Sequence, residues 1–337
     1  MGMLTELWAR LKEAGTGNGG GYRLQMIQTG PDLRVYAAIS DEGLRPGIFV
    51  EMPERVRPRD LSRITTRAFE AVAARFPGLP QGRCAISIQL KDPAFEDLFS
   101  VMCEEITRVL RRETTSENAC KALIRYVDRW RRFVEKGRRR LSDEAIRGLI
   151  GELVLLARCV RSLGALSAIQ FWSGPTGALR DFELPDCSVE VKTFQSDTGA
   201  SIRISDPQQL DTDNIRPVYL AAIKLSHVQS SGLTLPEYIQ RVEALIGADS
   251  EANELLQDRL ADYGYLSSQA SLYTEKYFAG PLSLYQVRES FPRIRSADVP
   301  PGVENVQFSI ALRTLDYFRL DPVLVVGPAV DTIEILE

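Results

Sequence analysis

Histidine is nearly absent from this sequence of 337 residues, which contains only His227. Metal sites of the HxH or HExxH type, and nuclease sites built on several histidines, are therefore excluded within this chain. A Ser-His-Asp triad has a single candidate base. His227 follows a short run of strand character and is interpreted as an ordinary strand-end residue. Hydrolytic chemistry in this chain must rest mainly on carboxylates and lysine.

Cysteine is also scarce, and its spacing excludes two further classes of site. The five cysteines are an odd number, are widely separated and include no CxxC pair. Neither a disulfide framework nor a zinc site is indicated by this pattern. We expect reduced, mostly buried cysteines at positions 84, 103, 120, 159 and 187.

Long apolar runs and a strong charge of one sign are missing as well. The N-terminus, Met1 to Ala14, alternates apolar and charged residues, which argues against a signal peptide or membrane anchor and favours a cytoplasmic protein. The net charge of -4 excludes a globally basic protein, so any nucleic-acid surface must be a local patch. The glycine cluster at 15–21 lacks the GK[ST] of an ATP-binding loop and is interpreted as a linker. ATP-driven translocation, if needed, would come from another chain.

Periodicity divides the chain into three predicted domains of mixed α/β class. Residues 1–115 form an N-terminal α/β accessory domain, 116–228 a core with a leading basic helix, and 229–337 a C-terminal α+β extension. The strands predicted in the accessory domain are Tyr22–Ile27, Leu33–Ile39, Gly47–Met52 and Cys84–Leu90, and its helices are Leu61–Phe76 and Phe95–Leu110. The extension is predicted to contain helices Leu235–Ile246 and Glu251–Tyr263 and strands at Val306–Leu312 and Val323–Leu336.

A basic helix is predicted over Ser116–Lys136, with Trp130 and Phe133 interleaved among arginines. Such a helix could follow a phosphate backbone, or it could be a solvated face whose positive end suits the helix dipole. The tyrosines of the stretch at 263–285 likewise have two alternative roles, which are contact with DNA bases and packing within the fold. The candidate DNA-contacting residues are Arg129, Arg132, Arg139 and Arg203.

The segment 179–194 carries the strongest signal for a catalytic site. Two alternating runs, 179–183 and 188–194, flank Pro185-Asp186 and predict a hairpin in which residue 184 pairs with 187. In that register Asp181 lies directly opposite Glu190, with Cβ atoms roughly 4.5–5.5 Å apart. Lys192 projects from the same strand face as Glu190. Two carboxylates and a lysine are therefore expected to converge.

The chemistry that suits this cluster is phosphodiester hydrolysis. Like charges on one sheet face need a counter-charge, and a hard divalent ion with oxygen ligands supplies one. Mg²⁺ held by Asp181 and Glu190 would polarise a phosphoryl oxygen and acidify a bound water, while Lys192 would position that water or stabilise negative charge. The alternative is a surface hairpin in which Lys192 simply pairs with a neighbouring carboxylate.

A second helix is predicted from the N-cap Ser142 to about Leu163. Glu152 lies at the edge of its apolar face, so it is either a surface residue or a carboxylate aimed at a site on the sheet. Gly151 beside it would permit a close approach of helix to sheet.

The order of elements over residues 142–225, helix, three strands, helix and strand, resembles the αβββαβ core of the PD-(D/E)XK nuclease superfamily. The resemblance to these restriction-endonuclease-like proteins is carried by Gly151-Glu152, Asp181-Phe182 and Glu190-Val191-Lys192. It implies that Asp181 and Glu190 are metal ligands with the Val191 carbonyl, that Lys192 is the catalytic lysine, and that Glu152 is an auxiliary ligand. The literal Pro185-Asp186 is a decoy, since four residues of extended chain put Asp186 roughly 13 Å from Glu190. Arg180 takes the place of the motif's proline.

The resemblance extends to bacterial PD-(D/E)XK motif proteins of phage-defence and restriction-modification-like loci, with Ser201–Ser205, Gln208–Leu210 and Phe291–Ile294 contributing. It implies a DNA endonuclease that uses Mg²⁺, with Mn²⁺ able to substitute, and that works beside methyltransferase or ATPase/helicase chains. The resemblance is compatible with a homodimer and implies no membrane partner. The alternatives are a catalytically silent DNA-binding or scaffold subunit and an RNA-directed enzyme of the same fold. Recognition sequence and modification dependence cannot be read from the sequence.

Overall fold

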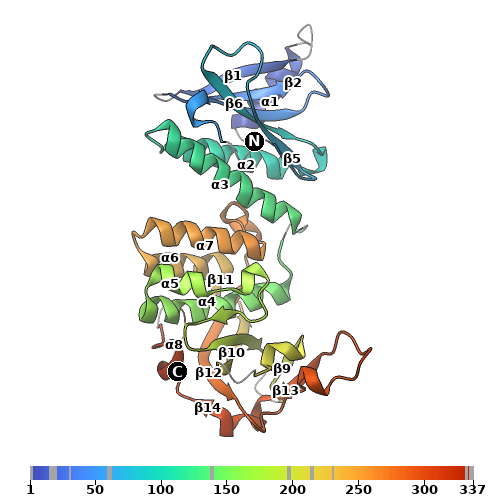
Figure 1. Ribbon diagram of the computed structural model, residues 1–337, viewed down its shortest axis with the longest axis vertical. Coiled ribbons are helices and arrows are strands. Elements are labelled where there is room, and N and C mark those ends of the chain that lie inside the picture. The colour runs from blue at the N-terminus through green and yellow to red at the C-terminus, as the bar shows by residue number, and fades with distance from the viewer. Residues whose placement is uncertain are drawn as a thin grey trace. The chain divides into compact units, whose positions relative to one another are not determined.

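The computed structural model divides the chain into two compact units, Met1–Arg138 and Arg139–Glu337, which are described separately (Figure 1). This division differs from the three predicted domains, whose boundaries fell after residues 115 and 228. The helix expected to lead the core packs in the first unit, and the expected C-terminal extension shares one sheet with the core. The structure describes residues 3–14, 21–29, 32–58, 63–136, 140–195, 199–212, 216–229, 231–330 and 333. Most of the predicted glycine linker lies outside these ranges.

The first unit is built on an antiparallel sheet of six strands in the order β1-β2-β3-β6-β5-β4. The four predicted strands of this unit are confirmed. The predicted helix over Leu61–Phe76 is wrong, because Phe69, Ala71 and Ala73 alternate with less buried residues as a strand requires. The strands are β1 Tyr22–Thr29, β2 Arg34–Ser40, β3 Pro46–Pro53, β4 Arg63–Thr65, β5 Phe69–Ala74 and β6 Arg83–Leu90.

Three helices complete this unit, α1 Met3–Glu13, α2 Glu96–Leu110 and α3 Ser116–Glu135, with short 3-10 turns at Glu54–Val56 (η1) and Pro93–Phe95 (η2). The helix α3 is the predicted basic helix, capped by the Thr115 side chain. Its aromatic residues are core residues: Trp130 and Phe133 are buried, and the Trp130 indole N–H donates to Glu105 of α2. Base stacking on these two rings is therefore excluded in this fold.

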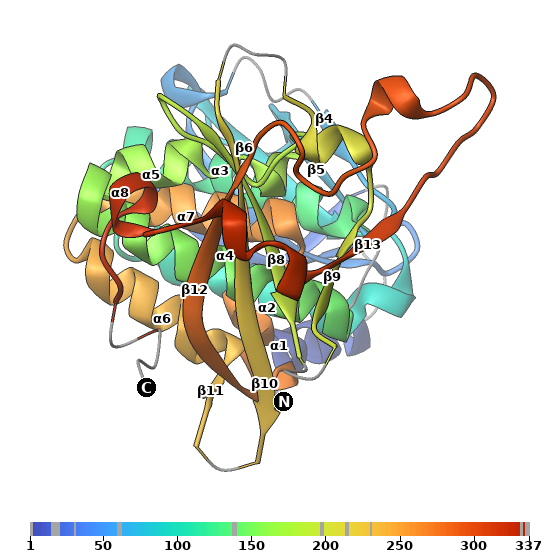
Figure 2. The same ribbon diagram turned by 90° about the horizontal axis from the view of Figure 1, so that it is seen from below.

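The second unit is a mixed sheet covered by helices on one face (Figures 1 and 2). The strand order is β11-β12-β10-β8-β7, with β14 also paired to β12. The neighbours β8 and β10 run parallel, whereas β7 pairs with β8 and β12 with β10 in antiparallel fashion. The strands are β7 Phe182–Glu183, β8 Ser188–Phe194, β10 Val218–Val228, β11 Leu233–Thr234, β12 Lys276–Val287 and β14 Arg319–Leu320.

The central strand β10 is buried on both sides, and its alternate residues belong to two different cores. Ala221, Ile223 and Leu225 pack with the helices α4, α6 and α7. Val218, Leu220 and Ala222 pack with β9 (Ser201–Ile204) and β13 (Phe308–Ala311). The helices are α4 Asp143–Leu163, α5 Ala165–Phe171, α6 Leu235–Ile246, α7 Ser250–Tyr263 and α8 Val323–Val326.

Two parts of the predicted αβββαβ order take a different form. The third strand, β9, forms a separate two-stranded sheet with β13 instead of joining the main sheet. The helix expected from Asp206 is only the 3-10 turn η4, Pro207–Leu210. A partner far away in the sequence decides where β9 pairs, because β13 lies about a hundred residues beyond β9. The other 3-10 turns are η3 Gly174–Thr176, η5 Ser267–Leu272, η6 Ser296–Asp298, η7 Leu312–Thr314 and η8 Asp316–Phe318.

The C-terminal part supplies core strands and core aromatics to this unit. Tyr265, Tyr273, Tyr277 and Tyr285 are all buried, which confirms packing over contact with bases for these tyrosines. The strand predicted at Val323–Leu336 is wrong at its start, where the chain forms α8, and most of its end lies outside the described residues. All five cysteines are free and buried, as expected. Among the described helices, none has the length and apolar character needed to cross a membrane.

Candidate active site

The hairpin of β7 and β8 has the predicted register. Phe182 pairs with Val189, and Glu183 with Ser188, so the turn consists of residues 184–187. Asp181 lies just before β7, and the same register places it opposite Glu190. Asp186 is exposed in the turn, as expected for a decoy.

Asp181 is fixed by backbone hydrogen bonds on both sides. Its carboxylate Oδ2 accepts from the Val191 N–H at 2.8 Å. Its carbonyl oxygen accepts from the N–H groups of Ser173 and Gly174, at 2.9 and 3.0 Å. The aspartate is therefore held between β8 and the start of η3.

Glu190 and Lys192 lie on the sheet face opposite α4, because Val189 and Val191 of the same strand pack toward the helices. The Lys192 ammonium lies 2.5 Å from Glu190 Oε1. Glu190 is 1% exposed, and its second oxygen, Oε2, is buried without a hydrogen-bond partner among the described residues. The pair leaves one carboxylate oxygen unsatisfied, which is costly in a folded interior.

Glu152 approaches the cluster from α4 and is buried, so it is not a surface residue. Trp172, at the end of α5, donates its indole N–H to Glu152 Oε2 at 2.7 Å. The hydroxyl of Tyr263, the last residue of α7, interacts with the same carboxylate and also donates to the Ala145 carbonyl at 3.4 Å. Two aromatic side chains thus orient this glutamate.

Two glycines provide the space in which these groups meet. A Cβ added to Gly151 would lie 2.6 Å from Thr193 Cγ2, which confirms that the glycine allows α4 to approach β8 closely. A Cβ added to Gly174 would lie 2.9 Å from both Asp181 Oδ1 and Glu152 Oε2. Gly174 therefore lies against both carboxylates, and a side chain at this position would collide with them.

Burial and mutual repulsion shift the protonation of the cluster. Burial raises the pKa of Glu190 to about 8, and the charge of Asp181 adds to that rise. Burial also raises the pKa of Asp181, although the charge of Lys192 opposes this shift. The pKa of Glu152 is raised well above its usual range, mainly by burial and next by the charge of Asp181. Burial alone would lower the pKa of Lys192, but the charges of Glu190 and Asp181 outweigh it and the net shift is upward. The lysine therefore stays charged beside carboxylates that hold protons unusually tightly.

The family model DUF4420, described as "Putative PD-(D/E)XK family member", matches residues 4–313. The chain belongs to this PD-(D/E)XK family. No curated protein and no solved structure matches the chain. The family match supports the resemblance carried by Asp181, Glu190 and Lys192, which the structure brings together.

The residues present fit the divalent ion that PD-(D/E)XK nucleases use. Within the described residues, no group of three or more carboxylate, histidine or cysteine side chains is placed to hold a metal ion. Among the described residues, Glu190 Oε2 is nevertheless a buried acceptor without a partner, and Asp181 Oδ1 lies beside Gly174, where no side chain covers it. Asp181 and Glu190 would hold the ion together with the Val191 carbonyl, as predicted, and water would complete the shell.

The predicted DNA-contacting arginines of this PD-(D/E)XK protein are scattered. Arg129 is 6% exposed and stacks over the Tyr126 ring, so it does not face solvent as a phosphate contact would. Arg132 pairs with Asp128 on α3. Arg203 is exposed on β9 in the second unit and contacts Gln307. Arg139 lies outside the described residues.

Sequence reasoning missed three residues at the site. Trp172 and Tyr263 contact Glu152, and Gly174 lies against the carboxylates of Asp181 and Glu152. In the sequence Tyr263 is only one member of a tyrosine-rich stretch, because no local pattern reveals that α7 ends beside α4. The sequence Trp172-Ser173-Gly174, shortly before Asp181, offers the one local signal of a tight turn at the site.

Proposed function

We propose that this protein is a metal-dependent DNA endonuclease whose site consists of Asp181, Glu190, Lys192 and Glu152, with Mg²⁺ as the metal and Mn²⁺ able to replace it. The observation that carries the proposal is the buried, unpartnered Oε2 of Glu190 beside Asp181 and Lys192. A fold tolerates such an atom where a ligand satisfies it. The family match supports the nuclease class.

The ion, when bound, would polarise the scissile phosphate and lower the pKa of a coordinated water. Asp181 would present Oδ1, because its Oδ2 is already engaged by Val191 N–H. Lys192 stays charged and lies next to Glu190, so it would orient the attacking water or stabilise negative charge on the phosphate. Glu152, held by Trp172 and Tyr263, would act as an auxiliary acceptor.

Covalently closed plasmid DNA provides the direct test, since it has no ends and only an endonuclease cuts it. We expect purified protein to nick or linearise the plasmid with Mg²⁺ or Mn²⁺ and to be inactive in EDTA. The variants Asp181→Asn and Lys192→Met should lose at least about a hundredfold in rate, as removal of a group that stabilises the transition state does. Cleavage that survives both substitutions would reject this site.

Asp186→Asn is the matched control. It makes the same chemical change as Asp181→Asn on the exposed aspartate of the literal Pro-Asp pair. Full activity in this variant, beside loss in Asp181→Asn, would support Asp181 as the motif's aspartate.

A catalytically silent DNA-binding or scaffold subunit is the second candidate. Its one favouring observation is that Lys192 already neutralises Glu190 through a 2.5 Å ion pair. Calorimetric titration with Mn²⁺ separates the two, because a silent subunit would bind no ion at Asp181 and Glu190. Parallel incubation with RNA tests the third alternative. The setting in a bacterial phage-defence or restriction system, beside methyltransferase or ATPase/helicase chains, rests on the resemblance alone and belongs to the proposal.

A further inference from the structure

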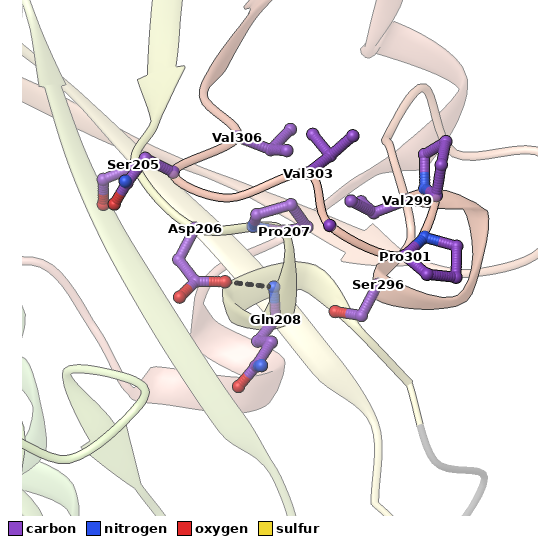
Figure 3. Close-up of a pocket in the computed structure, with 12 residues that line it drawn as sticks. Ser205, Asp206, Pro207, Gln208, Ser296, Val299, Pro301, Val303 and Val306 are labelled. Carbon is purple, nitrogen blue, oxygen red and sulfur yellow. Dashed lines mark hydrogen bonds between the residues drawn. The ribbon is translucent and has the colours of Figure 1, made fainter.

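A pocket with a volume of about 390 Å³ lies between η4 and the loop that carries η6 (Figure 3). Figure 3 shows three valines along one side of it, opposite Asp206, Gln208 and Ser296. The valines are Val299, Val303 and Val306. Its size is at the lower end of the range for small-molecule sites.

The lining selects a neutral, flat ligand with hydrogen-bond donors. No lysine, arginine or histidine lines the pocket in the described part of the chain, so a phosphate would find no counter-charge there. Asp206 is exposed and offers a carboxylate, of which Oδ1 also accepts from the Gln208 N–H at 2.9 Å. The Ser296 hydroxyl is buried without a partner among the described residues, and rotation about one bond would turn it toward a ligand. Valine and proline side chains in the lining offer apolar contacts to an aromatic ring.

Hydrogen bonds connect this pocket to the candidate active site. The Arg180 guanidinium, next to Asp181, donates to the carbonyls of Gln209 and Asp211 at 3.0 and 2.6 Å. These carbonyls lie at the end of η4, whose start forms the pocket. Asp211 in turn accepts from the Ser296 N–H at 3.2 Å, which holds the opposite wall.

We infer that the pocket receives one base of the bound DNA and reads its exocyclic amino group through the Asp206 carboxylate. The inference rests on the proposed nuclease function, which supplies DNA as the ligand. A carboxylate accepts from the exocyclic amino group of adenine, cytosine or guanine, whereas thymine has no amino group and offers only one ring N–H, flanked by two carbonyl oxygens that repel the carboxylate. Cleavage should therefore disfavour thymine at one fixed distance from the cut. A base in this pocket would leave its stack, as in other enzymes that read single bases.

Sequencing the ends released from a random-sequence DNA pool tests this specificity. We expect wild-type protein to cut with thymine depleted by about tenfold at one position, the scale of a good contact to a base. Asp206→Asn should remove that depletion, because an amide also donates to thymine. Asparagine keeps the cap of η4, so folding should be preserved. Asp298→Asn, the same change on an exposed carboxylate of η6 that does not line the pocket, is the matched control.

A second measurement does not depend on cleavage. The inactive variant Lys192→Met is mixed with DNA duplexes in which 2-aminopurine replaces one base. The fluorescence of 2-aminopurine rises when this base leaves the stack. We expect a rise that is lost when Val303→Phe is added to fill the pocket. Cleavage with unchanged end sequences in Asp206→Asn would overturn the inference and leave the nuclease proposal standing. A fluorescence rise that depends on Val303, without cleavage by wild-type protein, would reject the nuclease and keep the pocket. Absence of both cleavage and a fluorescence rise would reject the nuclease proposal and the base pocket together.

Discussion

At the scale of single residues, the site concentrates charge where a fold would ordinarily avoid it. Glu152 and Glu190 are 5% and 1% exposed, and both lie near the partly buried Asp181. One ammonium and one backbone N–H offset part of the repulsion, and Glu190 Oε2 remains without a partner in the described chain. An unsatisfied buried acceptor costs about 1–3 kcal/mol. Such a cost, in a cluster that matches the PD-(D/E)XK motif, indicates that these residues serve function and not stability.

Glu190→Gln should stabilise the metal-free protein at alkaline pH. The folded-state pKa of Glu190 is about 8, above its ordinary value of 4.5, so the folded state binds the proton more tightly than the unfolded state. The stability that this proton contributes is complete below pH 4.5 and is lost as pH rises through 8. In EDTA, wild-type protein should lose about 2 kcal/mol of unfolding free energy between pH 6 and 8 from this group. Urea denaturation at the two pH values measures the loss.

Glutamine cannot ionise, so the variant should lose less stability over the same interval. Asp181 and Glu152 shift in the same direction as Glu190 and will leave part of the slope. Glu183→Gln, on the same hairpin, is the control and should keep the wild-type slope. Identical pH slopes in wild type and Glu190→Gln would show that Glu190 ionises as freely as a surface carboxylate.

Tyr263→Phe should lower nuclease activity with little effect on stability. The hydroxyl binds Glu152, and its loss leaves only the Trp172 N–H to orient that carboxylate. We expect kcat/KM to fall by about tenfold, the scale of one lost hydrogen bond to a charged group. Plasmid cleavage over a range of Mn²⁺ concentrations measures this effect and shows whether more Mn²⁺ compensates.

Tyr273→Phe is the control, for which we expect a loss of stability without a loss of activity. It removes the same atom from a buried tyrosine whose hydroxyl accepts from the Leu141 N–H, away from the carboxylates. This variant should lose about 1 kcal/mol of stability and keep its activity. Equal losses of activity in the two variants would mean that the Tyr263 hydroxyl supports only the fold.

At the scale of secondary-structure elements, the contact of α4 with β8 sets the distance between Glu152 and the hairpin. Gly151→Ala should destabilise the protein, because its Cβ would lie 2.6 Å from Thr193 Cγ2. Overpacking costs about 1–3 kcal/mol, and the better helix propensity of alanine returns up to about 1 kcal/mol. Thr193→Ser removes the clashing methyl group. The double variant should therefore recover at least half of the loss, as measured by thermal and urea denaturation.

The two single variants and the double variant form a double-mutant cycle, and the informative quantity is the difference between the stability loss of the double variant and the sum of the two single losses. A double variant whose loss equals the sum of the two single losses would show that α4 does not press on Thr193. Recovery of stability together with activity would show that helix spacing also controls the position of Glu152.

The same elements show what could be predicted from the sequence. The register of β7 and β8 depends on strict alternation around a Pro-Asp turn, which is local information, and it was predicted correctly. The fate of β9 depends on β13, and the orientation of Glu152 depends on Trp172 and Tyr263, so no local pattern reveals either. The helix predicted over 61–76 was wrong because alanine at 71 and 73 hides the alternation of β5.

At the scale of the whole molecule, the chain consists of two units whose roles can be tested separately. In the part of the chain that the structure describes, the residues of the two cores around the candidate site all lie after residue 140. The groups proposed for catalysis, from Glu152 to Tyr263, also lie in this unit. The first unit has a sheet of its own and buries the aromatics of its basic helix. Catalysis and folding of the second unit should therefore need nothing from the first.

A fragment comprising residues 140–337 should fold and retain metal-dependent cleavage. We expect one cooperative transition in urea, because its hydrophobic cores are complete without the first unit. Its rate of plasmid cleavage should stay within about tenfold of the full chain at saturating DNA, since transition-state contacts come from the same residues. A larger loss that appears only at low DNA concentration would assign DNA binding to the first unit, where Arg132 lies. The matching fragment 1–136 should fold and cut nothing. A 140–337 fragment that lacks a cooperative transition would show that the second unit depends on the first, and the site could then no longer be ascribed to one unit alone.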